Sequence, residues 1–143
     1  MQVGDRFPIE EVGLSKGDGP AVVYFYAQAG TDGCTLEAHE FNRSYPRLQE
    51  AGVRLVGVSV DPEDVNQKFA ADCGLDFPLV SDPGGELTNR LGLMKTYGEY
   101  GDFAARVTLL VDENGIVQER WSASVDELPS HVQEVVERST TRT

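Results

Sequence analysis

Two cysteines are the residues of this sequence best suited to nucleophilic or redox chemistry. Cys34 stands where a polar loop passes into a helix-forming segment, and Cys73 lies near the end of a later one. The free amides and dipole of a helix N-terminus favour a thiolate, the nucleophilic form of cysteine, although a small cysteine at that position can also serve packing alone. Two cysteines are too few for a disulfide scaffold, and with His39 and His131 they do not form a zinc-ligand spacing. We therefore take reactivity at Cys34 as the candidate chemistry.

The elements that would position Cys34 follow from hydrophobic patterning and turn residues. Two expected strands are strongly apolar runs, Ala21–Tyr26 and Val53–Val60, and three more are expected at Phe77–Val80, Arg106–Val111 and Ile116–Trp121. The expected helices begin at about Cys34, at Asp61–Pro62, around Leu87 and Leu91, and at about Val125. Pro46 is expected to kink or restart the first helix, and Asp61 is expected to be the N-cap of the second, with Pro62 as its first residue.

This order of elements predicts an α/β fold. Strands separated by helices pair in parallel through right-handed crossovers, whereas the final two strands, joined through Asn114-Gly115, form an antiparallel hairpin. A central mixed sheet flanked by helices on both faces and ending in β-β-α is a thioredoxin-like fold. The length of 143 residues fits a single domain spanning the whole chain.

Composition narrows the functional classes. A net charge of −12 opposes binding to nucleic acid or to anionic membranes. The apolar runs are too short to cross a bilayer, and the first residues carry no secretory signal, so we expect a cytoplasmic protein. Nothing in the sequence requires a metal, flavin or haem cofactor.

The segment Val22–Ala38 resembles the active-site region of peroxiredoxins, in particular the peroxiredoxin Q or bacterioferritin-comigratory-protein subfamily. In that subfamily a strand ending in Tyr-Pro is followed by Thr-Pro-Gly-Cys-Thr and then Glu. The likeness continues in family order through Gly57–Asp61, Phe77–Asp82 and Arg106–Asp112. It implies a thiol-dependent peroxidase that reduces hydrogen peroxide and organic hydroperoxides, uses thioredoxin or another thiol reductant, and is a monomer or weak homodimer.

The resemblance also implies a role for individual residues. Cys34 matches the peroxidatic cysteine, which is oxidised to a sulfenic acid. Thr31 matches the threonine whose hydroxyl orients the peroxide, and Arg106 matches the arginine that holds the thiolate and polarises the oxygen–oxygen bond. Glu37 matches a helix residue that helps position this arginine, although a solvated carboxylate in the first helical turn is an equally good interpretation.

Several positions depart from the family pattern. Ala27 and Asp32 replace the two motif prolines, and the loss of both prolines loosens the loop. The carboxylate of Asp32 is also expected to raise the pKa of the nearby thiol and so to disfavour the thiolate. His39 occupies a position at which many members carry a resolving cysteine. Cys73 lies about one turn beyond the alternative resolving position, so it is either a structural cysteine or a resolving cysteine that requires the Cys34 helix to unwind in part.

Two other functions compete with this interpretation. A dithiol oxidoreductase needs Cys-x-x-Cys, but Glu37 stands at the second cysteine position. A non-catalytic redox sensor or interaction module with a degenerate site is favoured by Ala27 and Asp32, and is opposed by the joint presence of Thr31, Cys34 and Arg106.

Overall fold

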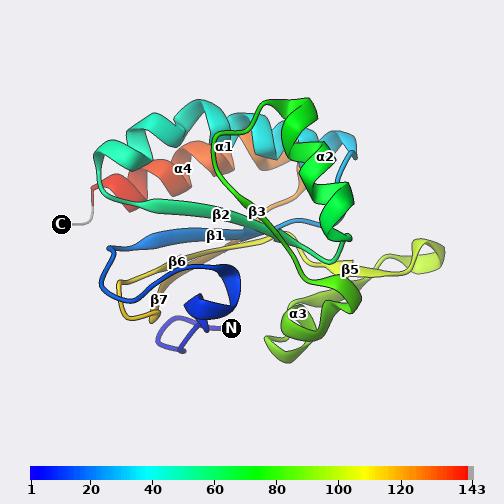
Figure 1. Ribbon diagram of the computed structural model, residues 1–143, viewed down its shortest axis with the longest axis horizontal. Helices are drawn as coiled ribbons and strands as arrows, with labels where there is room; N and C mark the ends of the chain where they lie inside the picture. Colours follow the sequence, from blue (N-terminus) through cyan, green and yellow to red (C-terminus); the bar gives the residue numbers. More distant parts are fainter. Residues whose placement is uncertain (142–143) are drawn as a thin grey trace.

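The computed structural model describes residues 1–141 and arranges them around a five-stranded sheet with helices on both faces (Figure 1). The strands of this sheet are β1 (Ala21–Phe25), β2 (Arg54–Ser59), β3 (Leu79–Ser81), β6 (Val107–Val111) and β7 (Val117–Ser122). Their order is β3-β2-β1-β6-β7; β1, β2 and β3 run parallel, whereas β6 is antiparallel to both β1 and β7. The predicted mixed sheet and thioredoxin-like fold are confirmed.

Helices enclose the sheet as two layers. In Figure 1, α1 (Asp32–Glu50), α2 (Glu63–Cys73) and α4 (Leu128–Thr140) lie above the sheet, and η1 (Ile9–Val12) and α3 (Glu86–Arg90) lie below it. Short 3-10 turns complete the connections: η2 (Pro83–Gly85), η3 (Gly98–Tyr100) and η4 (Val125–Glu127). None of the helices within residues 1–141 is long and apolar enough to cross a membrane.

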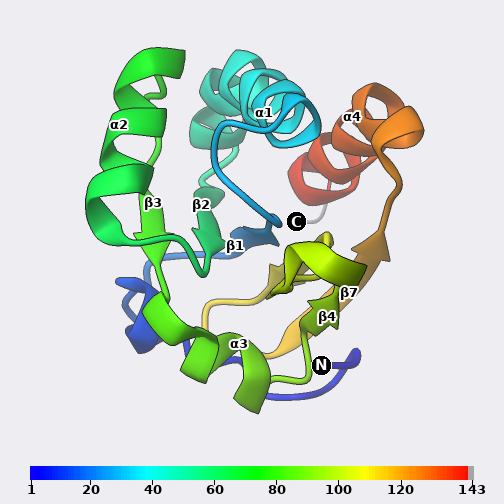
Figure 2. The same ribbon diagram turned by 90° about the vertical axis from the view of Figure 1, so that its right-hand side faces the viewer.

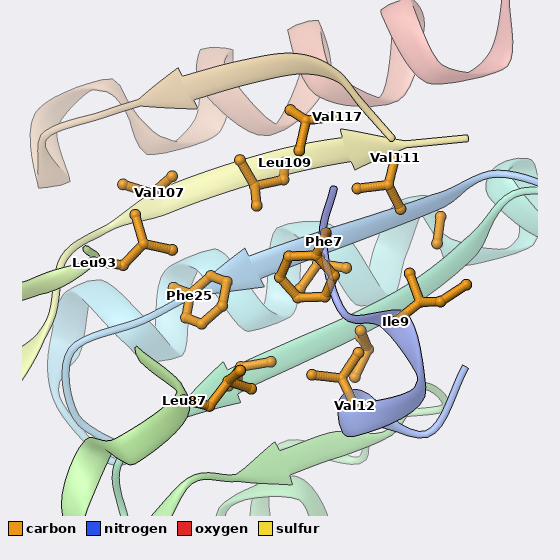
Figure 3. Close-up of a cluster of buried hydrophobic side chains, with 14 of the residues drawn as sticks. Phe7, Ile9, Val12, Phe25, Leu87, Leu93, Val107, Leu109, Val111 and Val117 are labelled. Atoms are coloured by element: carbon orange, nitrogen blue, oxygen red, sulfur yellow. The ribbon is translucent and has the colours of Figure 1, made fainter. Parts of the chain in front are cut away.

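The residues of strand β1 contribute to two hydrophobic cores, one on each face of the sheet. All five of its residues are buried, because alternate side chains of a central strand point to opposite faces and both faces are covered. Val22 and Tyr24 pack towards α1, α2 and α4. Val23 and Phe25 pack into the opposite cluster, which Phe7, Ile9, Val12 and Leu87 close from below (Figure 3).

Two local predictions about helices are wrong. Pro46 does not restart the helix, because α1 continues without a break from Asp32 to Glu50; Phe41 and Leu48 on either side of it are fully buried and pack both parts of the helix against the sheet. Asp61 does not cap α2: Pro62 is the N-cap residue and the helix starts at Glu63. The side chain of Asp61 instead bonds to the loop before α1, as described below.

A second, two-stranded sheet was not expected from the sequence. It is a hairpin of β4 (Met94–Thr96) and β5 (Asp102–Ala104), which extends from the end of the molecule where β1 leads into α1 (Figure 1). Its strands are three residues each and only Ala104 is buried, so they lack the long apolar alternation that identifies a strand.

Candidate active site

Cys34 is the third residue of α1 and is almost fully buried. The helix begins directly after the loop that follows β1, so the thiol lies at the carboxyl end of the central strand. Figure 2 looks onto this end of the molecule, with α1 and α4 seen nearly end-on above the β4–β5 hairpin. The cysteine therefore occupies the helix N-terminus predicted from the sequence, where backbone amides favour a thiolate.

Strand register brings Arg106 to Cys34. In the antiparallel pairing of β1 with β6, Phe25 lies opposite Val107, so the start of β6 adjoins the loop that leaves β1. Arg106 immediately precedes Val107, and its Nη2 donates a hydrogen bond to Cys34 Sγ at 3.5 Å. A guanidinium at this distance favours the thiolate and can also stabilise the charge that develops on a departing oxygen.

Glu37 holds the other side of the same guanidinium. It lies one helical turn after Cys34, so both side chains project from one face of α1. Arg106 Nη1 donates to Glu37 Oε1 at 2.7 Å, and the Glu37 side chain is fully buried. The interpretation of Glu37 as a solvated carboxylate is therefore wrong, because the packing of α1 on the sheet buries Glu37 against Arg106. The sequence alone leaves this choice open, because only the tertiary fold determines burial.

The electrostatics of this pair are dominated by burial. Desolvation raises the pKa of Glu37 to about 7, although Arg106 opposes the shift. The Oε2 atom of Glu37 has no hydrogen-bond partner among the described residues, which agrees with a carboxyl group that burial keeps partly protonated near neutral pH. Burial lowers the pKa of Arg106, but Glu37 and Cys34 together outweigh this effect and raise it.

Thr31 is the N-cap residue of α1, three residues before Cys34. Its side chain is exposed, and its hydroxyl donates to the carbonyl of Gln28 at 2.9 Å. Its backbone carbonyl accepts both the amide and the hydroxyl of Thr35. The structure thus places Thr31 beside the site and gives its hydroxyl a partner within the loop, and its contact with a peroxide stays a prediction.

A buried polar network anchors this loop where the family pattern would have a proline at Ala27. Asp61 Oδ2 accepts a hydrogen bond from the amide of Ala29 and another from Ser59 Oγ, each at 2.8 Å. Ser59 in turn bonds to Asn66, which also receives the hydroxyl of Tyr26. This network was not predicted from the sequence, although polar residues at the carboxyl end of a parallel strand are a signal that could have revealed it.

Two tyrosines near the site were also missed. The hydroxyl of Tyr24 is buried without a hydrogen-bond partner among the described residues; its pKa is raised by burial first and then by Glu37, Tyr26 and the two cysteines. Tyr97 of the β4–β5 connection has a pKa raised by burial, with Arg106 lowering it and Cys34 raising it. Both rings therefore form part of the surroundings of the thiol.

The residue after Cys73 contacts α1 about two turns beyond Cys34 in this conformation. The carbonyl of the next residue, Gly74, accepts a hydrogen bond from Asn42 Nδ2 at 3.2 Å, and Asn42 lies two turns of α1 beyond Cys34. A helical rise of 1.5 Å per residue puts that point about 12 Å along the axis, whereas a disulfide needs Cα atoms within about 7 Å. Both cysteines are free, and His39 is exposed on α1. A bond between the cysteines would thus require α1 to unwind locally.

The fold and these contacts define a class of protein. It is a thioredoxin-like domain with a cysteine at a helix N-terminus, next to an arginine that is hydrogen-bonded to a buried glutamate. A model of the AhpC/TSA family matches residues 4–120. The chain belongs to that family, and its relatives carry peroxiredoxin names.

Two sequence relatives come from the peroxiredoxin Q and bcp group. The "putative peroxiredoxin bcp" of Coxiella burnetii is 31% identical over 96% of this chain and 98% of its own length. Chloroplastic peroxiredoxin Q of Sedum lineare is 39% identical over 75% of this chain, and the match covers only 57% of that longer protein.

Solved structures give the same grouping. Peroxidoxin BcpB from Mycobacterium tuberculosis superposes with a TM-score of 0.79 and 27% identity, covering 100% of this chain and 99% of that one. A cysteine-to-serine variant of peroxiredoxin Q from Xanthomonas campestris superposes with a TM-score of 0.83 and 26% identity over the full length of both chains.

Proposed function

We propose that this protein is a thiol-dependent peroxidase that reduces hydroperoxides with Cys34 as its nucleophile. The observation that carries the proposal is the pair of hydrogen bonds that Arg106 makes, one to Cys34 Sγ and one to buried Glu37. Two relationships support it further: membership of the AhpC/TSA family, and similarity to a bacterioferritin comigratory protein of Xanthomonas campestris whose structures concern alkyl peroxide reduction.

The chemistry needs the thiolate at the N-terminus of α1, Arg106 before β6, and a peroxide. The Cys34 thiolate attacks one peroxide oxygen, a sulfur–oxygen bond forms, and the oxygen–oxygen bond breaks. The sulfur loses two electrons and becomes a sulfenic acid, while the departing oxygen takes both electrons and a proton to leave as water or an alcohol. Arg106 stabilises the negative charge on the attacking and departing atoms, and Thr31 is the proposed hydroxyl that orients the peroxide.

An external thiol, such as thioredoxin, is the proposed reductant of the sulfenic acid. The separation between Cys73 and the first turns of α1 supports a cycle in which Cys34 is the one essential cysteine. Cys73 could take part only after local unwinding, with a disulfide as the product. The proposed location of the protein is the cytoplasm, which cell fractionation would check. Its proposed oligomeric state is a monomer or weak homodimer, which sedimentation would check.

Single-turnover oxidation with intact-mass analysis tests this function. Reduced wild-type protein, Cys34→Ser and Cys73→Ser each receive one equivalent of hydrogen peroxide. The proposal expects stoichiometric peroxide consumption by wild type and by Cys73→Ser, with a gain of one oxygen atom in the latter, and no consumption by Cys34→Ser. Loss of two hydrogens in wild type, abolished by either substitution, would show a Cys34–Cys73 disulfide instead of the one-cysteine cycle. Unchanged peroxide in the wild-type sample would leave the non-catalytic sensor as the better description.

A further inference from the structure

A pocket of about 550 Å³ is lined by residues of the β4–β5 hairpin, the end of edge strand β7 and the turn before α4. Lys95 and Tyr97 line it from the hairpin side, Arg120 from β7, and Val125 from the turn before α4. Arg106 also lines the pocket, so one side chain belongs both to this space and to the thiol. The volume falls in the range of small-molecule binding sites.

Positive charge is concentrated in this pocket although the protein as a whole carries −12. Lys95, Arg106 and Arg120 all line it. Lys95 Nζ lies 5.2 Å from the centre of the Tyr97 ring, and within residues 1–141 no carboxylate lies at ion-pair distance from Lys95 or Arg120. Two exposed cations without acidic partners are therefore available to a ligand.

The remaining lining residues make the pocket amphipathic. Tyr97, Val107 and Val125 contribute apolar surface. Glu127 is the carboxylate among the described lining residues, and it is engaged by Ser124, whose amide and hydroxyl donate to it at 3.0 and 2.8 Å. A ligand that fits has an apolar body and an anionic group.

We propose that this pocket binds the carboxylate of an organic hydroperoxide, with Lys95 and Arg120 as its ion-pair partners and the peroxide end directed towards Arg106 and Cys34. This inference rests on the proposed peroxidase function and adds a substrate class to it. The concave shape and apolar lining favour a small molecule over an acidic surface of a protein reductant, which would need a flatter area of contact.

The net charge of the protein predicts how fast an anionic hydroperoxide would react if the pocket did not bind its carboxylate. A net charge of −12 repels anions, so without a local site an anionic hydroperoxide would react more slowly than a neutral one of the same shape. Cumene hydroperoxide bearing a para-carboxylate, compared with its methyl ester, is such a matched pair. The measured quantity is the ratio of their second-order rate constants with reduced protein, followed by stopped-flow.

The wild-type ratio is expected to favour the carboxylate about fivefold at low salt, the factor that two partly exposed ion pairs supply, and to fall towards one at about 0.5 M NaCl. The double variant Lys95→Gln/Arg120→Gln should lose the preference. The matched control, Lys16→Gln/Arg47→Gln, removes two exposed cations near the opposite end of the sheet and should keep it. Because the readout is a ratio, a change in the reactivity of Cys34 itself cancels.

A binding measurement separates this inference from the proposed function. The alcohol that corresponds to the carboxylated hydroperoxide is titrated into Cys34→Ser and followed by amide NMR, which needs no turnover. Shifts at Lys95, Tyr97 and Arg120 support the pocket even if hydrogen peroxide is not consumed by wild type. The inference is overturned by a wild-type ratio at or below one, by a ratio that survives in the double variant, or by an absence of shifts. A double variant that keeps the ratio but reacts poorly with a protein reductant would assign the two cations to that reductant.

Discussion

Glu37→Gln is the substitution that most directly tests the electrostatics of the site. Burial raises the pKa of Glu37 from 4.5 to about 7 in the folded protein. A carboxyl with a raised pKa holds its proton more tightly when folded, so its contribution to stability is fully present below pH 4.5 and is lost as the pH rises to about 7. At about 1.4 kcal/mol per pKa unit, this loss amounts to about 3 kcal/mol. Glutamine preserves an oxygen that can accept from Arg106 but does not titrate.

The assay is urea unfolding of wild type and Glu37→Gln at several pH values between about 4.5 and 8.5, followed by circular dichroism. As the pH rises across this range, the difference in the free energy of unfolding between variant and wild type should shift by about 3 kcal/mol in favour of the variant. Most of this shift should occur below pH 7. Glu40→Gln, one turn further along α1, controls for the loss of one carboxylate. A difference that stays constant with pH would refute the reasoning, because it would mean that Arg106 keeps Glu37 ionised throughout.

Three further substitutions test the contacts around the thiol. Arg106→Gln removes the guanidinium 3.5 Å from Cys34 Sγ and should slow stopped-flow oxidation by hydrogen peroxide about 100-fold, with Arg106→Lys recovering only part of the rate. Asp61→Ala removes the acceptor of the Ala29 amide and should cost about 2 kcal/mol in urea unfolding and speed hydrogen exchange at that amide; unchanged exchange would contradict the proposed anchor. Gly33→Ala would bring a methyl group within 2.9 Å of Val125 and 3.2 Å of Arg106, so a loss of about 1–3 kcal/mol is expected, and Val125→Ala in the same chain should restore most of it.

Local patterning was sufficient to predict the framework. Each of the five expected segments contains a strand of the main sheet. For β1, β2 and β6 the reason is that a strand buried on both faces leaves a continuous apolar signal. The predictions that were wrong concern residues with two competing local roles. Asp61 has the sequence features of a helix cap, yet its carboxylate satisfies the Ala29 amide across the chain, an interaction that no local rule describes.

The sequence by itself determined the order of the main-sheet strands and the α-helices, and the position of Cys34 at the start of α1, since both follow from short-range preferences of neighbouring residues. Only the tertiary structure decided what surrounds the sulfur. The pairing of β1 with β6 brings Arg106 to Cys34, and the packing of α1 on the sheet removes Glu37 from water. Distance and desolvation depend on residues far apart in the chain, and these two quantities give the thiol its partner and the glutamate its raised pKa.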